Sequence, residues 1–239
     1  MSLAQNLAHI REQIADACRR ANRSEAGVAL MAVSKMHPAE AVVEAYAAGL
    51  HLFGENRVQE FAEKSPALAS LSGSEFHLIG PLQSNKTARA AEIFHAIDSV
   101  DSLKIATRLN AAAIALGKRL PILIEVKLSH EDSKHGIAPA ELPALLATLA
   151  PLESLVPSGL MTVPPWPTDL ANAGGEARPY FSQLRHLRDA SLAACPTLTQ
   201  LSMGMSHDFA AAIEEGSTCI RIGTALFGKR QPATSSQLA

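Results

Sequence analysis

Cysteine is scarce in this sequence, and patterns typical of metal sites are missing. The chain of 239 residues has three cysteines, Cys18, Cys195 and Cys219, which are odd in number and far apart. No cysteines have the spacing of metal-ligand pairs, and the nine histidines form no His-x-x-x-His pattern. We therefore expect buried free thiols and no metal site.

Charge of one sign and long apolar runs are also lacking. The 21 basic and 23 acidic residues leave a net charge of −2, which gives no field that would attract nucleic acid or an anionic membrane. No apolar run approaches the roughly 20 residues that span a bilayer. We expect a cytoplasmic protein whose partners are small molecules or other proteins, with no nucleic acid and no membrane involved.

What the chain does have is a regular alternation of strand-like and helical segments after an opening helix at 3–20. Eight segments read as strands: 28–35, 50–56, 75–80, 95–100, 121–129, 157–163, 199–206 and 217–228. Eight parallel strands in one domain-length chain predict a single (β/α)8 TIM barrel with an extra N-terminal helix, and an open doubly wound sheet is the alternative. We place this domain at 1–230 and a polar tail at 231–239.

Polar residues gather where barrel enzymes place their chemistry, at the carboxyl ends of the strands. Lys35 ends the first predicted strand and Asn56 ends the second. A lysine whose pKa is lowered by its surroundings is a neutral amine that attacks carbonyl groups. A solvated lysine on an apolar stem is the alternative interpretation.

Small and hydroxyl residues follow the last two predicted strands, where such barrels often hold a phosphate. "SMGMS" supplies Ser202, Gly204 and Ser206, and "RIGT" supplies Gly223 and Thr224. Each group alone is common in ordinary turns. Their occurrence at both places predicts a phosphate site.

Arg221 lies two residues before Gly223 on an otherwise apolar strand, and therefore on the same face of it. A buried guanidinium must find a partner, which is either an acidic residue such as Glu55 or Asp98, or a ligand. A phosphate site, this arginine and Lys35 together suit a phosphorylated aldehyde. Pyridoxal 5′-phosphate (PLP) is the candidate.

The motifs "AVSK", "FGENRVQE", "FHLIGPLQSNK", "IDSVDSLKIATRLN", "EVKLSHEDSKHGI", "GLMTV", "LSMGMSHD" and "AAIEEGSTCIRIGTALFG" follow one another between residues 30 and 230. In order and spacing they resemble the pyridoxal phosphate homeostasis protein family. Met36, His37 and Arg57 depart from the usual pattern, which leaves the wall of the pocket undefined.

The resemblance implies a barrel similar to the N-terminal domain of alanine racemase. It implies that Lys35 holds PLP as a Schiff base and that Asn56 lies near the cofactor. Arg221 would face the pyridine nitrogen. The phosphate would be held by Ser206, Gly223 and Thr224, with Ser202 and Gly204 shaping the loop.

The function implied is buffering or delivery of PLP by a monomer, with PLP-dependent apo-enzymes as recipients and no catalytic turnover. A PLP-dependent racemase is the alternative, but it needs a second, tyrosine base, and neither Tyr46 nor Tyr180 is placed as that base. A phosphosugar-type barrel enzyme is a third interpretation. Lys134 reads either as a solvated loop lysine or as a second amine for the aldehyde.

Overall fold

The computed structural model describes residues 2–129, 131 and 134–228. Its eight strands form one closed barrel in sequence order, every neighbouring pair is parallel, and β8 pairs with β1. The strands are β1 Ala29–Val33, β2 Leu52–Glu55, β3 Glu75–Leu78, β4 Ala96–Val100, β5 Leu120–Glu125, β6 Leu155–Met161, β7 Gln200–Ser202 and β8 Cys219–Ile222. The predicted barrel is confirmed, and the open sheet is wrong.

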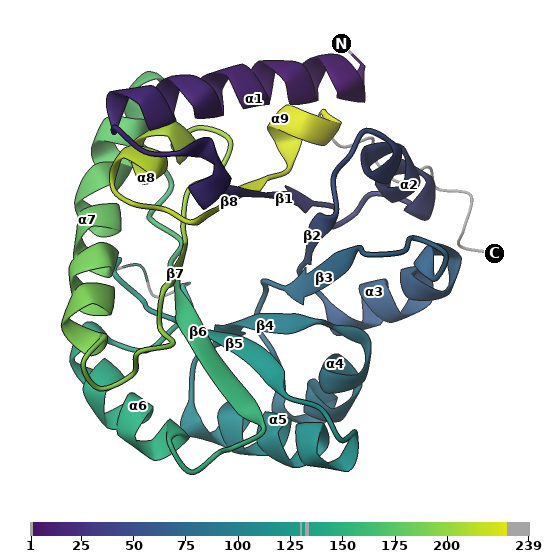
Figure 1. The fold of residues 1–239 in the computed structure, drawn as a ribbon, viewed down its shortest axis with the longest axis vertical. Coiled ribbons are helices and arrows are strands. Elements are labelled where there is room, and N and C mark those ends of the chain that lie inside the picture. Colours follow the sequence, from purple (N-terminus) through teal and green to yellow (C-terminus); the bar gives the residue numbers. More distant parts are fainter. Residues whose placement is uncertain (1, 130, 132–133, 229–239) are drawn as a thin grey trace.

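Helices surround this ring of strands (Figure 1). The α-helices are α1 Leu3–Arg20, α2 Ala39–Ala47, α3 Val58–Lys64, α4 Thr87–Ile93, α5 Leu103–Ala115, α6 Leu142–Leu149, α7 Ala173–Ser191, α8 Phe209–Glu214 and α9 Thr224–Phe227. Short 3-10 helices lie at η1 Glu25–Gly27, η2 Ser65–Leu68, η3 Ser84–Lys86, η4 Pro139–Glu141 and η5 Leu170–Asn172. Within the described residues, no helix is both long and apolar enough to cross a membrane.

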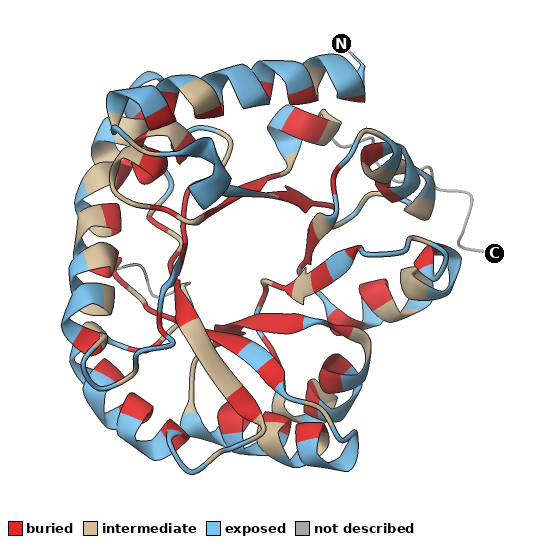
Figure 2. Cartoon of the chain, in the orientation of Figure 1, coloured by how far each residue is buried: buried red, intermediate tan, exposed pale blue. Residues whose placement is uncertain are grey.

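Side chains alternate between the inside of the barrel and the layer between strands and helices. Phe53 and Phe76 face outward and stack with ring centroids 5.2 Å apart, and Phe76 also contacts Phe61 of α3. Met31 faces inward, because a Cβ at Gly54 would lie 2.7 Å from its Sδ atom. Figure 2 shows the same division, with buried positions on the barrel-facing side of the helices.

The predicted N-terminal helix is confirmed as α1. Ser2 caps it through a capping box with Gln5, which satisfies amide groups that have no partner within the helix. Its apolar face is buried, and Asn6 Nδ2 donates to the Leu226 carbonyl of α9 at 2.9 Å. The helix therefore packs beside the end of the chain that forms β8 and α9.

Two local expectations differ from the structure, and a third lies outside the described residues. The Pro- and Gly-rich stretch 164–177 is typical of a loop, but helix α7 begins within it, at Ala173. Glu176 accepts hydrogen bonds from Thr168 and Asp169 and so fixes the turn before the helix. Cys18 and Cys219 are buried as expected, but Cys195 is only half-buried. The predicted tail at 231–239 lies outside the described residues, so the domain boundary stays a prediction.

Candidate functional site

The predicted site residues follow four neighbouring strands, in the order β2, β1, β8 and β7 around the barrel. All of them lie at the carboxyl end of their strand or at most four residues beyond it. They are Asn56 after β2, Lys35 after β1, Arg221, Gly223 and Thr224 at the end of β8, and Ser206 after β7. The fold thus brings one mouth of the barrel together from segments that are far apart in the sequence.

Lys35 lies in a turn rather than in the strand itself, because β1 ends at Val33. The turn is closed by a hydrogen bond from the His37 amide to the Ser34 carbonyl at 3.1 Å. Lys35 is half-buried, whereas Met36 is 67% exposed and has a left-handed backbone with φ of 62°. The strand therefore leads the chain directly to a sharply bent segment that carries the lysine.

His37 connects this turn to the end of β8. Its ring stacks on Phe227 of α9, with ring centroids 4.7 Å apart. Gly223, which precedes α9, also faces β1, since a Cβ built on it would lie 3.4 Å from the Val33 carbonyl oxygen. The lysine turn and the β8 loop are therefore in contact on one wall of the mouth.

Arg221 is 4% exposed, and its guanidinium points toward the ends of β6 and β7. It donates from Nη1 to the carbonyl and hydroxyl of Ser202, at 2.6 and 2.8 Å. From Nη2 it donates to the Thr162 carbonyl at 2.8 Å. These bonds fix the plane of the guanidinium against the inner surface of the barrel.

The ion pairs considered for Arg221 in the sequence are not the ones that form. Glu55 pairs instead with Lys64, with 2.7 Å between Oε1 and Nζ, and Asp98 accepts from His77 at 3.0 Å. Burial lowers the pKa of His77, but Asp98 and then Glu75 outweigh it and raise the value to about 9. Both acids therefore already have cationic partners, Lys64 on α3 and His77 on β3.

Two further acids near Arg221 were missed by the sequence analysis. Burial raises the pKa of Glu125, at the end of β5, to about 7, although the positive charge of Arg221 opposes the shift. Burial also raises the pKa of Asp208, which is 6% exposed. Nothing in the spacing of either acid distinguishes it from an ordinary strand-end or helix-start residue, so only the packing could find them.

The β7 loop is built from residues that allow close approach. Gly204 has φ of 98°, and a Cβ there would lie 2.6 Å from the Cβ of Ala212. Its carbonyl accepts from the Arg221 amide at 2.9 Å. Ser206 Oγ, further along, accepts from the Ala225 amide at 3.3 Å, so the β7 and β8 loops are hydrogen-bonded to each other. Asp208 closes the loop by accepting from the Met205 amide.

Asn56 is half-buried directly after β2. Its backbone packs against Gly80, where a Cβ would lie 2.4 Å from the Asn56 carbonyl oxygen. Arg57, by contrast, is exposed at the start of α3. Of the three residues that depart from the family pattern, His37 stacks on Phe227, whereas the side chains of Met36 and Arg57 are exposed.

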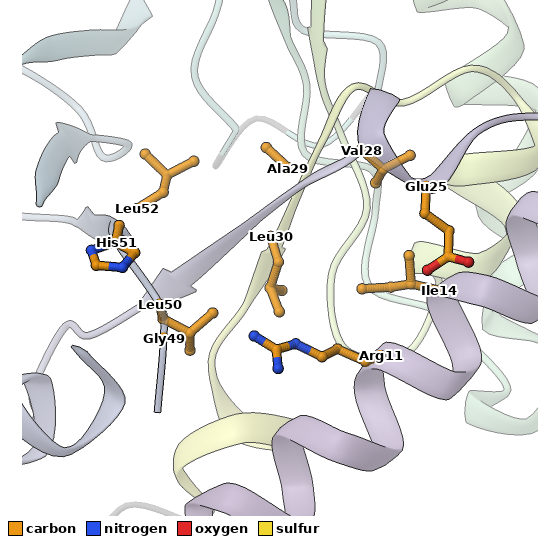
Figure 3. A pocket seen from close by; sticks show the side chains of 10 residues that line it. All are labelled: Arg11, Ile14, Glu25, Val28, Ala29, Leu30, Gly49, Leu50, His51 and Leu52. Carbon is orange, nitrogen blue, oxygen red and sulfur yellow. The ribbon is translucent and has the colours of Figure 1, made fainter. Parts of the chain in front are cut away.

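A cavity of about 400 Å³ lies at the other end of the strands, between them and α1 (Figure 3). It is lined by Ala29 and Leu52, the first residues of β1 and β2, and by Arg11 and His51. None of the predicted site residues lines it. This cavity is therefore separate from the mouth that carries Lys35.

Comparison with known proteins identifies the family. Residues 5–231 match the family model described as alanine racemase, N-terminal domain. The chain is also 47% identical over 230 residues to the pyridoxal phosphate homeostasis protein of Pseudomonas aeruginosa, with 96% of each chain covered. This chain belongs to the pyridoxal phosphate homeostasis protein family. The resemblance seen in its motifs is thus confirmed.

Solved structures agree with this family assignment. PipY of Synechococcus elongatus PCC7942, whose structure is known with PLP bound, has a TM-score of 0.84 and 41% identity, and the match covers 95% of this chain and all of PipY. Alanine racemase of Clostridium difficile 630 has a TM-score of 0.69 at 15% identity, and the match covers 96% of this chain and 58% of the racemase. The second likeness shows a shared barrel fold alone.

The two tyrosines considered as a racemase base and the lysine considered as a second amine have contacts away from the predicted site residues. Tyr46 donates from its hydroxyl to the Ser72 carbonyl at 2.8 Å, and Tyr180 lies in α7, partly buried against the core. Lys134 Nζ is 3.6 Å from the Glu131 carboxylate in the loop after β5. That contact fits a loop lysine, and a role as a second amine stays untested.

Proposed function

We propose that this protein binds PLP and that Lys35 holds it by a covalent bond. The observation that carries the proposal is the arrangement of the mouth, where a lysine turn and two glycine- and hydroxyl-containing loops meet on adjacent strands. Family membership and the PLP-bound structure of PipY support it.

The residues present suit the chemistry of this ligand. Ser206, Gly223 and Thr224 supply hydroxyl and main-chain groups to a phosphate, which neutral donors bind well when they are fixed beforehand. Arg221 would donate to the pyridine nitrogen, and Asn56 would line the mouth opposite the phosphate.

The chemistry at Lys35 is a condensation. The neutral amine attacks the aldehyde carbon, a C=N bond forms, and the aldehyde oxygen leaves as water. Addition of water reverses the step and releases the aldehyde unchanged. A ligand held in this way is available for storage and transfer, so the proposed role is PLP homeostasis by buffering or delivery.

The proposed role does not include catalytic turnover. An arginine facing the pyridine nitrogen donates a hydrogen bond and cannot protonate the ring as a carboxylic acid would, so the ring remains a weak electron sink. The hydroxyl of Tyr46 is bonded outside the mouth, and Tyr180 packs beside the core, which disfavours a racemase. Action as a cytoplasmic monomer with apo-enzymes as recipients is part of this proposal and rests on the sequence.

The test uses Lys35→Ala, with Lys134→Ala as its control. We expect loss of the visible absorption of the PLP adduct in Lys35→Ala and its retention in Lys134→Ala, because removal of one partly exposed amine leaves the fold intact. Borohydride reduction followed by peptide mapping locates the label. Labelling mainly at Lys86 or Lys134 in the unmodified protein would place the site elsewhere.

A further inference from the structure

A buried network surrounds the backbone just before Lys35. Ser34 Oγ donates to Glu55 Oε1 at 2.7 Å, and Lys64 Nζ donates to the same carboxylate oxygen at 2.7 Å. Lys64 Nζ also donates to the Ser34 carbonyl at 3.0 Å. The side chains of Glu55 and Lys64 are 0% and 8% exposed, so this is an ion pair inside the protein.

The network continues to the other side of Lys35. Glu60 accepts from the Met36 amide at 2.5 Å and lies 3.7 Å from Lys64 Nζ. The Ser34 carbonyl and the Met36 amide belong to the two peptide groups that flank the Lys35 Cα. Because the orientation of these two peptide groups defines φ and ψ of Lys35, the network fixes the direction in which its side chain leaves the backbone.

Burying the two charges of Glu55 and Lys64 lowers the free energy of unfolding unless the pairing compensates for their lost hydration. Burial raises the pKa of Glu55, while the Lys64 charge and the hydrogen bonds from Lys64 and Ser34 oppose the shift. The second carboxylate oxygen, Oε2, is buried without a hydrogen-bond partner. Apolar residues in place of a buried ion pair are often as stable or more so, so a gain in stability does not explain the pair.

We infer that Glu55 and Lys64 are positioning residues that aim the Lys35 amine at the aldehyde of the bound ligand. The inference rests on the proposed function, since it takes Lys35 as the amine that reacts. Neither residue touches the ligand: Lys64 acts through the Ser34 carbonyl and Glu55 through the Ser34 hydroxyl. The network controls how fast the covalent bond forms, and not how tightly the phosphate is held.

The test is the double variant Glu55→Gln/Lys64→Met, which removes both charges of the buried pair at nearly constant volume. Glu60 loses its contact with Lys64, but its side chain is 27% exposed and keeps the hydrogen bond from the Met36 amide. The variant loses the hydrogen bond from Lys64 to the Ser34 carbonyl. We expect the adduct with PLP to form about 10- to 100-fold more slowly, the range that a misplaced reacting group produces. Pyridoxine 5′-phosphate, which has an alcohol in place of the aldehyde, should bind as it does to the unmodified protein.

Lys118→Met is the matched control. Lys118 is also a partly buried lysine that donates to a backbone carbonyl, that of Phe94 at 3.2 Å, but it precedes β5 at the opposite end of the barrel. Its removal should leave the rate of adduct formation unchanged. A milder second variant, Ser34→Ala, removes only the bond to Glu55 and should slow the reaction less than the double variant does.

An unchanged rate in the double variant overturns the inference. Equal loss of the rate and of pyridoxine 5′-phosphate affinity also overturns it, because that is the result of general structural damage. If the double variant does not fold, Ser34→Ala decides: slower reaction at unchanged pyridoxine 5′-phosphate affinity supports the inference, and an unchanged rate refutes it. Failure of the unmodified protein to form any adduct at Lys35 is a separate result that overturns the proposed function as well.

Discussion

The two sides of the barrel mouth bury their charges in different ways. On the lysine side, made of residues 34–37 with Glu55, Glu60 and Lys64, opposite charges pair directly with one another. On the phosphate side, made of residues 202–206 and 221–224, the recorded hydrogen bonds of the Arg221 guanidinium go to neutral oxygens of Ser202 and Thr162. The positive charge is thus paired directly with carboxylates on the first side, whereas on the second side its direct hydrogen bonds go to neutral groups and the acids Glu125 and Asp208 lie nearby.

The difference shows how one mouth can serve two ends of a ligand. On the phosphate side, the backbone geometry of Gly204 and its hydrogen bond from the Arg221 amide hold neutral hydroxyl and main-chain donors in place. The lysine side has no anion to attract and instead uses an internal ion pair to hold a turn. The following changes test whether the two sides differ as described.

Arg221→Met should have the largest effect, a loss of about 3 to 5 kcal/mol in the free energy of unfolding, because it leaves the buried oxygens of Ser202 and Thr162 without their hydrogen-bond donor. Urea unfolding measures it. Arg178→Met is the control: its side chain is 43% exposed and pairs with Glu214 and Glu215, so we expect a loss of about 1 kcal/mol or less. Equal losses would mean that the Arg221 charge is not buried as described.

Glu125→Gln, a change near Arg221, should alter the pH dependence of the free energy of unfolding. The pKa of Glu125 rises from 4.5 to about 7 on folding, because burial and the negative charge of Asp101 outweigh the opposing positive charges of Arg221 and Lys134. The folded protein therefore holds an extra proton between these values, and its free energy of unfolding falls by about 3 kcal/mol as pH rises through them. The variant should lack this fall.

Urea unfolding between pH 4.5 and 6.5 checks this prediction. His77 complicates higher pH, because its raised pKa of about 9 adds stability that is complete below pH 6.5 and lost as pH rises through 9. A slope between pH 4.5 and 6.5 that is the same in Glu125→Gln and in the unmodified protein would show that Glu125 ionises normally.

Gly204→Ala should destabilise the protein by about 2 to 3 kcal/mol, since the added Cβ meets both a left-handed φ of 98° and a contact of 2.6 Å with Ala212. Gly73→Ala is the matched control: φ is 71°, but no atom lies within 4 Å of the new Cβ, so backbone strain of about 1 kcal/mol remains. Thermal unfolding separates the two. Similar values would remove the argument that the phosphate loop needs glycine for packing.

Ser206→Ala should have the smallest effect, about a tenfold loss of PLP affinity, because one hydrogen bond to a dianion is lost. Affinity for pyridoxal, which lacks the phosphate, should not change. Equilibrium titration of both ligands measures the difference. Equal weakening for the two ligands would assign Ser206 to another part of the site.

Much of the candidate site could be predicted from the sequence because it depends on position along single segments. Lys35, Asn56, Ser206 and Gly223 each follow a strand whose alternation and flanking residues are visible locally, and parallel strands place such residues at one end of a barrel. The end of the first strand differs from the prediction: the lysine was expected within that strand, but the left-handed backbone of Met36 and the bond from the His37 amide to the Ser34 carbonyl show that the chain has already turned.

The sequence by itself determined the order of strands and helices, the family and the residue types at the mouth, since these follow from local hydrophobic pattern and from motifs. Only the tertiary structure decided which charges meet. Arg221 donates to the carbonyl of Thr162, 59 residues away, and not to the acidic partners first considered for it. Lys64 donates to the carbonyl of Ser34, 30 residues away. Several acids are chemically able to pair with either cation, and only the closing of the barrel selects among them, because burial makes each pairing depend on distance and on the surrounding solvent.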